Sequence, residues 1–381
     1  MLKSLAVPLA AALLASAVSG CTFSKVDPNA TVTISGTALD ATGAPLAGAQ
    51  VRVFTEADLA DLILGGVVAL GTLGSICLLP DAPTICHKGH TATTAADGTF
   101  SLRIKGSDTQ GLIGTEATLD AVIASKNATS SDPSTTLSFT VKKTTVQLPA
   151  ARLWNAGLKV SQSKDHIQLR WNALPSSYGS KAAFSANVYI PNQQAALWIQ
   201  SAKGTAADID PRVIEDINGT AAAGARTSLD GTGTGTVHAN YLSGRLPVRA
   251  TAGAPPSRHR ACDAVMGIAN FTTATQASCG ATDGNLVSPA RLTGTKAAVV
   301  TGAVIDMGRP VHISLVDAHG IAGLTDVELS NDGKSYHQVG ILADSLSSFS
   351  PPGDPVARYV RVRAPSGLDE SLLYEISVWS S

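Results

Sequence analysis

The chain has 381 residues, a formal net charge of −1 and only 15% charged residues. Such a balance provides neither the basic field that attracts nucleic acid nor an acidic tail, which disfavours function through broad charge. The length predicts two or three domains, each large enough for its own core. With 35 glycines, 19 prolines and few helical repeats of apolar residues, the composition predicts an all-β fold of short strands and turns.

The amino-terminal segment has the layout of an export signal. Lys3 is followed by a short apolar region, Leu5 to Leu14, and then by small residues that lead to Cys21. The apolar region is too short to span a membrane as a helix. Residues 18–21, Val-Ser-Gly-Cys, resemble the lipobox of bacterial lipoproteins.

That resemblance implies a signal peptide over 1–20, cleavage before Cys21, a lipid thioether on Cys21 and a linker over 21–30. Two or more acyl chains anchor a protein stably. We therefore expect an exported protein, lipid-anchored to the bacterial cell membrane or outer membrane. The alternative is ordinary secretion with a coincidental cysteine.

Apart from Cys21, the cysteines form two pairs that are close in sequence. They are Cys77, Cys86, Cys262 and Cys279. Four cysteines allow three connectivities, and in an oxidising compartment local pairing is the simplest, so we predict Cys77–Cys86 and Cys262–Cys279 disulfides. The alternative is a zinc site formed by Cys77, Cys86, His87 and His90, although the spacing matches none of the common zinc patterns.

Residues 31–54 predict a strand, a turn and a second strand. Val32 and Ile34 alternate with polar residues, as do Val51 and Val53, around a turn near Gly43. A second turn over 97–98, Asp-Gly, leads into another alternating segment. Together these segments resemble the carboxypeptidase regulatory-like, transthyretin-like family over about 31–150. The resemblance implies a β-sandwich that acts as a spacer and carries no catalysis.

An insertion interrupts this module. Leu59, Leu62, Ile63 and Val67 fall on one helical face and predict an inserted helix near 56–75. No residue from 62 to 80 is charged, so the alternative is a segment that touches a membrane or a partner.

The middle region, 151–255, is predicted to be rich in strands. Its segment 166–171 resembles the second strand of fibronectin type III domains, in which a tryptophan, here Trp171, packs in the core. Asp210 and Pro211 predict the start of a short helix that ends by Asn218.

The region 256–381 contains four sequence segments that are each predicted to be a strand or a turn at the end of a strand. They are 281–285 (ATDGN), 304–308 (VIDMG), 327–336 (VELSNDGKSY) and 357–362 (ARYVRV). In this order they resemble the discoidin, or coagulation-factor C-type, galactose-binding-like family, which implies a β-jelly-roll.

The same resemblance implies a structural calcium ion that joins an early loop to the last strand. The implied ligands are the Asp283 carboxylate, the Asn285 carbonyl, the Ser288 hydroxyl and carbonyl, the Tyr374 carbonyl and the Glu375 carboxylate. Oxygen ligands suit a hard cation. A carboxylate in a mostly apolar strand also needs a partner. The alternative is a turn aspartate and a solvent-exposed Glu375.

The ligand site is expected at the jelly-roll tip. Arg291 and His319 lie where loops could converge, and Phe349 is an aromatic side chain outside the strand phrases, whereas Tyr336, Tyr359 and Trp379 are expected in the core. The alternative for Arg291 and His319 is ordinary loop surface.

No nucleophile elbow, metalloprotease motif, phosphate loop or paired catalytic carboxylate phrase occurs in the chain. We therefore expect no enzyme, although a triad within 151–255 is an alternative because triads are recognised by geometry. The predicted function is a lipid-anchored envelope protein that displays a carbohydrate-binding or adhesion jelly-roll, with a glycan or an envelope surface protein as partner. The alternative is a structural or assembly component of an envelope complex.

Overall fold

The computed structural model describes residues 23–55, 89–111, 114–129, 131–178, 182–189, 198–214, 220–229, 237–250, 253–266, 273–278, 280–284, 290, 302–321, 325–342, 348–363 and 372–381. Within these ranges the secondary structure consists of β-strands and three short 3-10 helices, so the all-β prediction is confirmed. The expected signal peptide, Cys21 and the inserted helix near 56–75 lie outside the described residues. Among the described elements, no helix has the length and apolar character needed to cross a membrane.

The first body begins with a small sheet. It consists of β4 (Thr99–Lys105), β1 (Thr31–Leu39) and β7 (Thr145–Gln147), with β8 (Ala151–Arg152) also paired to β1. β1 is antiparallel to β4 and parallel to β7 and β8. Val32 and Ile34 are buried while their neighbours in β1 are partly exposed, as the alternating sequence predicts.

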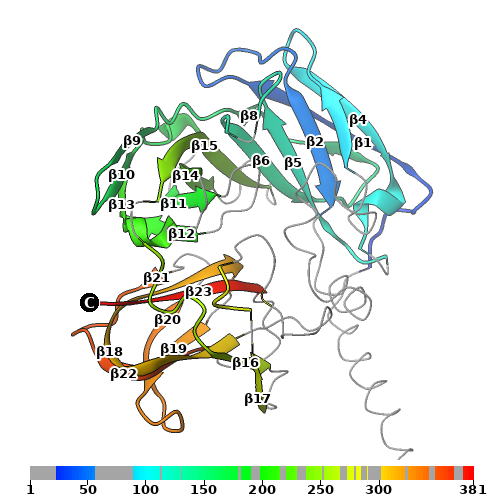
Figure 1. The fold of residues 1–381 in the computed structure, drawn as a ribbon. Coiled ribbons are helices and arrows are strands. Elements are labelled where there is room, and N and C mark those ends of the chain that lie inside the picture. Colours follow the sequence, from blue (N-terminus) through cyan, green and yellow to red (C-terminus); the bar gives the residue numbers. More distant parts are fainter. Residues whose placement is uncertain are drawn as a thin grey trace, which may run out of the picture.

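A long antiparallel sheet forms most of the first body. Its order is β12 (Trp198–Ala202), β11 (Ala183–Tyr189), β14 (Thr220–Leu229), β15 (His238–Arg249), β6 (Ser134–Thr140), β5 (Thr118–Ala124), β2 (Gln50–Thr55) and β3 (His90–Thr93). A three-stranded sheet lies beside it, made of β13 (Ala206–Ile209), β10 (Ile167–Arg170) and β9 (Lys159–Gln162). Figure 1 shows these sheets as one arc above the carboxy-terminal strands.

The long sheet crosses the boundary expected between residues 150 and 151. β15, from the middle region, pairs with β6, from the first predicted module, with Ala239 opposite Leu137. Buried residues from both segments also share one hydrophobic core, which includes Ile34 as well as Trp171 and Trp198. The described residues between 23 and 250 therefore form one structural body.

Short elements complete this body. The 3-10 helices are η1 (Gly106–Thr109), η2 (Ser176–Tyr178) and η3 (Pro211–Ile214). η3 begins where a short helix was expected, and residues 215–219 lie outside the described ranges. The expected linker is packed against the body at its end, because Val26 is buried in the core and its carbonyl accepts a hydrogen bond from Gln110 Nε2 at 2.6 Å.

The carboxy-terminal body has its own core and an eight-stranded sheet system. Its strands are β16 (Cys262–Met266), β17 (Thr273–Ser278), β18 (Gly302–Ile321), β19 (Thr325–Ser330), β20 (His337–Leu342), β21 (Ser348–Phe349), β22 (Val356–Arg363) and β23 (Leu372–Ser380). The main path runs β17-β16-β18-β22-β19-β20, while β21 and β23 also pair with β18.

Strand β18 changes partners along its length. Residues 303–312 pair with β22, whereas residues 313–321 pair with β23, and the register with β22 shifts between Asp306 and Val311. A strand that passes from one partner strand to another turns a corner between two layers, as in packed β-sandwiches and jelly-rolls.

The two bodies are in contact. Leu315 and Trp379, on one face of β18 and β23, belong to the core of the first body. Arg212, in η3, donates a hydrogen bond from Nη1 to Ser314 Oγ at 3.0 Å, and its guanidinium lies 5.8 Å from the centre of the Trp379 ring.

The continuous sheet generates a prediction about fragments. A fragment of residues 23–250 should unfold in one cooperative transition, because it keeps the β6–β15 pairing and the shared core. A fragment of residues 23–150 should aggregate or remain unfolded, because it exposes the edge of β6 and half of that core. Circular dichroism melting and amide proton spectra of both fragments test this. A well-dispersed spectrum with a cooperative transition for 23–150 would contradict it.

Candidate functional site

Of the three residues expected at the jelly-roll tip, the structure describes His319 and Phe349. His319 lies within β18 and is 1% exposed, so the prediction that it belongs to a surface loop is wrong. The turn-like sequence over 317–320 continues the strand, because β23 pairs with it and a register shift after His319 accommodates Gly320. Phe349 is half-buried in β21, with its ring packed against Gly340. Arg291 lies outside the described residues.

Two tyrosines expected in the core lie elsewhere. Trp379 is buried as predicted, but Tyr336 and Tyr359 are half-buried. Arg361 lies 3.8 Å from the centre of the Tyr336 ring, and Arg358 lies 4.9 Å from that of Tyr359. These aromatic rings therefore support arginine side chains by cation–π contact.

A stripe of buried polar side chains runs along the paired strands β18 and β23. Asp317, His319, Glu375 and Ser377 are at most 1% exposed, and His319 stands opposite Glu375 in the register. His319 Nε2 lies 3.0 Å from Asp317 Oδ2. Burial raises the pKa of Asp317. Burial lowers the pKa of His319, but the interactions with the neighbouring Asp317 together have the larger effect, so the pKa of His319 is raised overall.

Glu375 meets two groups of the chain itself. Its Oε2 accepts a hydrogen bond from Gly284 N at 3.0 Å, and its Oε1 lies 3.6 Å from Arg258 Nε. Burial nevertheless raises the pKa of Glu375 to about 7, because the Gly284 amide and the Arg258 guanidinium offset only part of the loss of solvent.

The expected calcium ligands are only partly described. Asp283 is exposed at the turn and Tyr374 lies in β23, while Asn285 and Ser288 lie outside the described residues. A calcium ion bound at Glu375 would be repelled by the positive charge of Arg258. Two like unit charges at 4 Å repel each other by about 4 kcal/mol at an effective dielectric constant of 20, and a divalent ion doubles this repulsion. Because a guanidinium already stands beside Glu375 Oε1, the residues here do not fit a calcium ion at that oxygen. In the described part of the chain, no group of three or more His, Cys, Asp or Glu side chains is arranged to hold a metal ion.

Cys262 forms a disulfide bond in the structure. Its partner lies outside the described residues, as do Cys77, Cys86 and Cys279, so the predicted connectivity stays a prediction.

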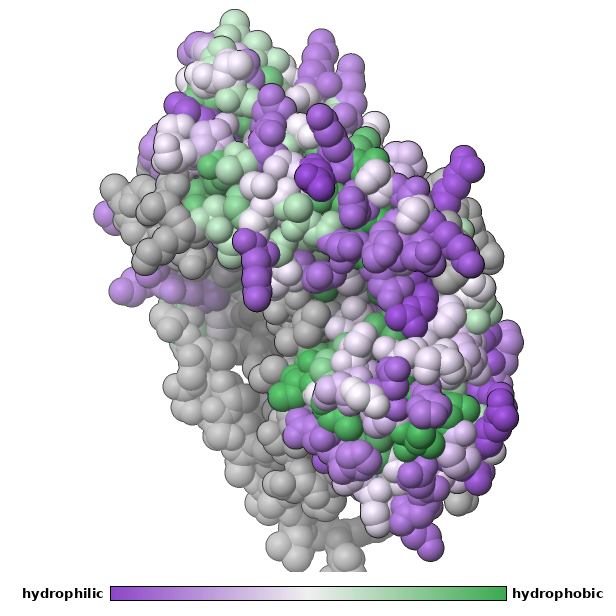
Figure 2. All heavy atoms as spheres, turned by 90° about the vertical axis from the view of Figure 1, so that its left-hand side faces the viewer, coloured by the Kyte–Doolittle hydropathy of each residue, from purple (hydrophilic) through white to green (hydrophobic). Residues whose placement is uncertain are grey.

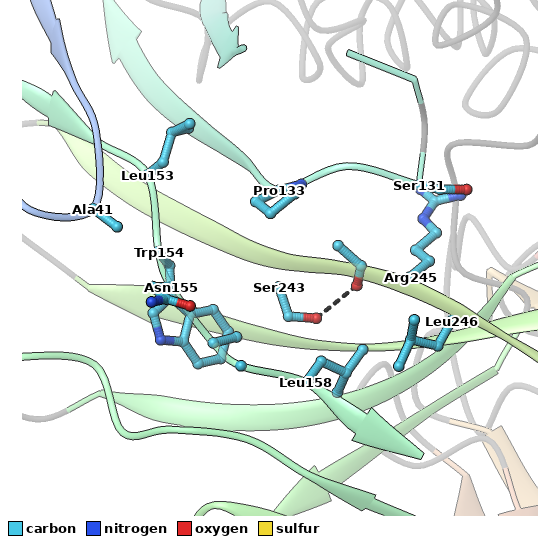
Figure 3. A pocket seen from close by; sticks show the side chains of 13 residues that line it. Ala41, Ser131, Pro133, Leu153, Trp154, Asn155, Leu158, Ser243, Arg245 and Leu246 are labelled. Atoms are coloured by element: carbon cyan, nitrogen blue, oxygen red, sulfur yellow. Dashed lines mark hydrogen bonds between the residues drawn. The ribbon is translucent and has the colours of Figure 1, made fainter. Parts of the chain in front are cut away.

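A groove of about 380 Å³ opens in the first body (Figure 3). It forms where the segment that links β8 to β9 passes the middle of β15 and the loop before β6. The lining residues come from four distant segments of the chain. They are Ala41, Ser131, Pro133, 153–158 and 243–246.

A distortion of β15 shapes this groove. The register between β14 and β15 shifts between Gly224 and Arg226, opposite Ser243 and Gly244. Ser243 Oγ accepts a hydrogen bond from Ala225 N at 2.8 Å, and Gly244 has a φ of +83°, which favours glycine. The strand therefore bends away from its neighbour at the point where the groove opens.

The groove combines an apolar wall with polar groups. In Figure 3, Ser131 and Pro133 lie along one side and Leu158 and Leu246 along the other. Leu246 is 36% exposed and is one of the few exposed large hydrophobic residues in the described part of the chain. Trp154 is fully buried beneath the groove.

Two polar side chains stand beside this wall. Asn155 is exposed. The guanidinium of Arg245 is held 3.6 Å from the centre of the Tyr189 ring, and burial lowers the pKa of Arg245. Sequence reasoning missed the groove because its lining segments are far apart along the chain.

No protein-family model matches the sequence, and no curated protein matches it. Solved structures show weak likeness. The family 89 glycoside hydrolase from Clostridium perfringens is 15% identical, with a TM-score of 0.25 over 34% of this chain and 15% of that one. Catechol 1,2-dioxygenase from Pseudomonas arvilla C-1 is 22% identical, with a TM-score of 0.15 over 26% and 33%. A Ca²⁺-stabilized adhesin of an Antarctic bacterium is 11% identical, with a TM-score of 0.18 over 93% and 99%. Likeness at this level assigns no function to the chain.

The raised pKa of Glu375 generates a prediction about pH. Between about pH 4.5 and pH 7 the folded state keeps a proton on Glu375 that the unfolded chain has released, so this group should lower the free energy of unfolding as pH rises through that window. Glu375→Gln should flatten the profile there. Urea unfolding at a series of pH values measures it, with Asp354→Asn, at an exposed site in the same body, as the control. An unchanged slope in Glu375→Gln would contradict the assignment.

Proposed function

We propose that the protein is a lipid-anchored, non-catalytic protein of the bacterial cell envelope that binds carbohydrate in the groove of the first body. The groove carries this proposal, because at about 380 Å³ it falls in the size range of small-molecule sites. The expected tip site receives less support, since His319 is buried.

The chemistry of the groove suits a sugar. A sugar ring presents an apolar face of C–H groups and a rim of hydroxyl groups. Leu158 and Leu246 supply an apolar wall for the C–H face of the ring. Ser131, Asn155 and Arg245 supply hydrogen-bond donors and acceptors for its hydroxyl groups.

The same lining argues for binding without cleavage. Most glycosidases use a pair of carboxylates on either side of the bond that breaks. Among the described residues that line the groove there is no carboxylate, histidine or cysteine. These side chains can therefore hold a glycan, and the lining serines have no carboxylate or histidine among the described lining residues to act as their base.

A structural or assembly role is the second candidate, and a surface of the carboxy-terminal body favours it. Arg361 and Arg363 both contact Glu328, and Arg361 also lies over Tyr336. Arginine and tyrosine are enriched in protein interfaces. Figure 2 shows hydrophobic and hydrophilic residues mixed on the side of the molecule that faces its viewer.

Substitution of the exposed Leu246 tests whether the groove binds carbohydrate. Leu246→Ser should weaken binding of the tightest glycan found on an array by about tenfold or more, because it removes apolar contact at the wall while an exposed substitution changes stability little. Ile341→Ser, at a 46% exposed position in the other body, is the matched control and should bind normally. Equal binding by both variants and the unmutated protein would remove the groove from the proposal.

The anchor is tested separately. Cys21→Ser should release the protein from the membrane fraction, because the thioether requires the thiol. Fractionation and labelling with a fatty-acid analogue measure this. Absence of label in the unmutated protein would contradict the anchor and leave the groove unaffected.

A further inference from the structure

We infer that Arg258 takes the place of a metal ion in the carboxy-terminal body, where its guanidinium joins an early turn to the last strand. The inference is independent of the proposed glycan groove. The discoidin-like resemblance assigns a calcium ion to this place, and the described residues there fit calcium poorly.

Three segments far apart in the sequence meet at this place: 257–260, 281–284 and strand β23. Each pair of segments is joined directly by hydrogen bonds. These are His259 N to Thr282 O at 2.7 Å, Ile376 N to Ala281 O at 2.7 Å, Val378 N to Ser257 Oγ at 2.8 Å and Gly284 N to Glu375 Oε2 at 3.0 Å. The chain therefore already makes the connection that a bridging ion would make.

Arg258 lies at the centre of this junction. Its side chain is 17% exposed and its Nε is 3.6 Å from Glu375 Oε1. The turn is shaped to receive it, because a Cβ atom at Gly284 would collide with Arg258 Nη1. Gly284 also has a φ of +85°, so glycine at this position serves both the turn and the close approach of the guanidinium.

The backbone beside Arg258 supports the same assignment. His259 has a φ of +57°, an uncommon conformation for a residue other than glycine. It is held by the hydrogen bond from His259 N to Thr282 O. The turn that carries Arg258 is thus fixed against the turn that carries Gly284.

Charge completes the argument. Glu375 is fully buried, and the nearby Asp283 adds a second negative charge that acts on it. A guanidinium stays protonated under all ordinary conditions, so a positive charge always lies beside Glu375. A metal ion does so only when it is bound. The carboxy-terminal body should therefore keep its stability when calcium is removed.

The experiment uses the soluble Cys21→Ser form of the full chain at about pH 8, where Glu375, with a pKa of about 7, is ionised. Its melting temperature should be the same in millimolar calcium and in chelator. Arg258→Met should lower the melting temperature by several degrees, because removing one partner of a buried pair leaves an uncompensated charge. Arg258→Lys, which keeps the charge, should lower it less.

The double variant Arg258→Met/Glu375→Gln separates this role from simple packing. It should recover a large part of the loss caused by Arg258→Met, because the uncompensated carboxylate is then gone. Additive losses in the double variant would overturn the inference. So would a melting temperature of the starting protein that falls in chelator and returns with calcium. If Arg258→Met does not fold, the chelator comparison and the Arg258→Lys variant still decide.

Discussion

The pairing of β15 with β6 is the interaction on which the first body depends. It carries the long sheet from strands before residue 150 into strands after it, so that two segments with different sequence patterns share one core. The same strand bends at Ser243 and Gly244, where its register with β14 shifts. The bend opens the groove, so the proposed binding site is a consequence of how the two segments join.

In the carboxy-terminal body, the main constraint is that strands β18 and β23 are buried on both faces. One face of β18 and β23 fills its own core, and the other face lies against the first body through Leu315 and Trp379. A strand buried on both faces must also bury any polar side chain it carries, at a cost unless a partner is present. His319 lies against Asp317, and Glu375 lies near Arg258. These pairs explain how charged groups persist in the interior.

Local sequence patterns predicted where strands lie better than they predicted which strands pair with one another. Alternation over residues 31–39 correctly indicated a strand with buried Val32 and Ile34, and the segment 357–362 was also correctly predicted to be a strand. The segment around His319 was misread, because glycine and aspartate suggest a turn while the decisive fact, pairing with β23, is contributed by residues more than fifty positions away. Tyr336 and Tyr359 were assigned to the core because they lie in predicted strand segments, but Tyr336 precedes β20 and Tyr359 is only half-buried in β22. The apolar neighbours of Glu375 predicted that it needs a partner, but the sequence did not show that this partner is Arg258.

The central claim is that the groove between the two joined segments binds carbohydrate. Amide NMR of the soluble protein during titration with its tightest glycan tests it most directly. The account predicts the largest shifts at Asn155, Arg245 and Leu246, with the strands of the carboxy-terminal body unaffected. Shifts confined to the carboxy-terminal body, or binding with no change at these residues, would contradict it.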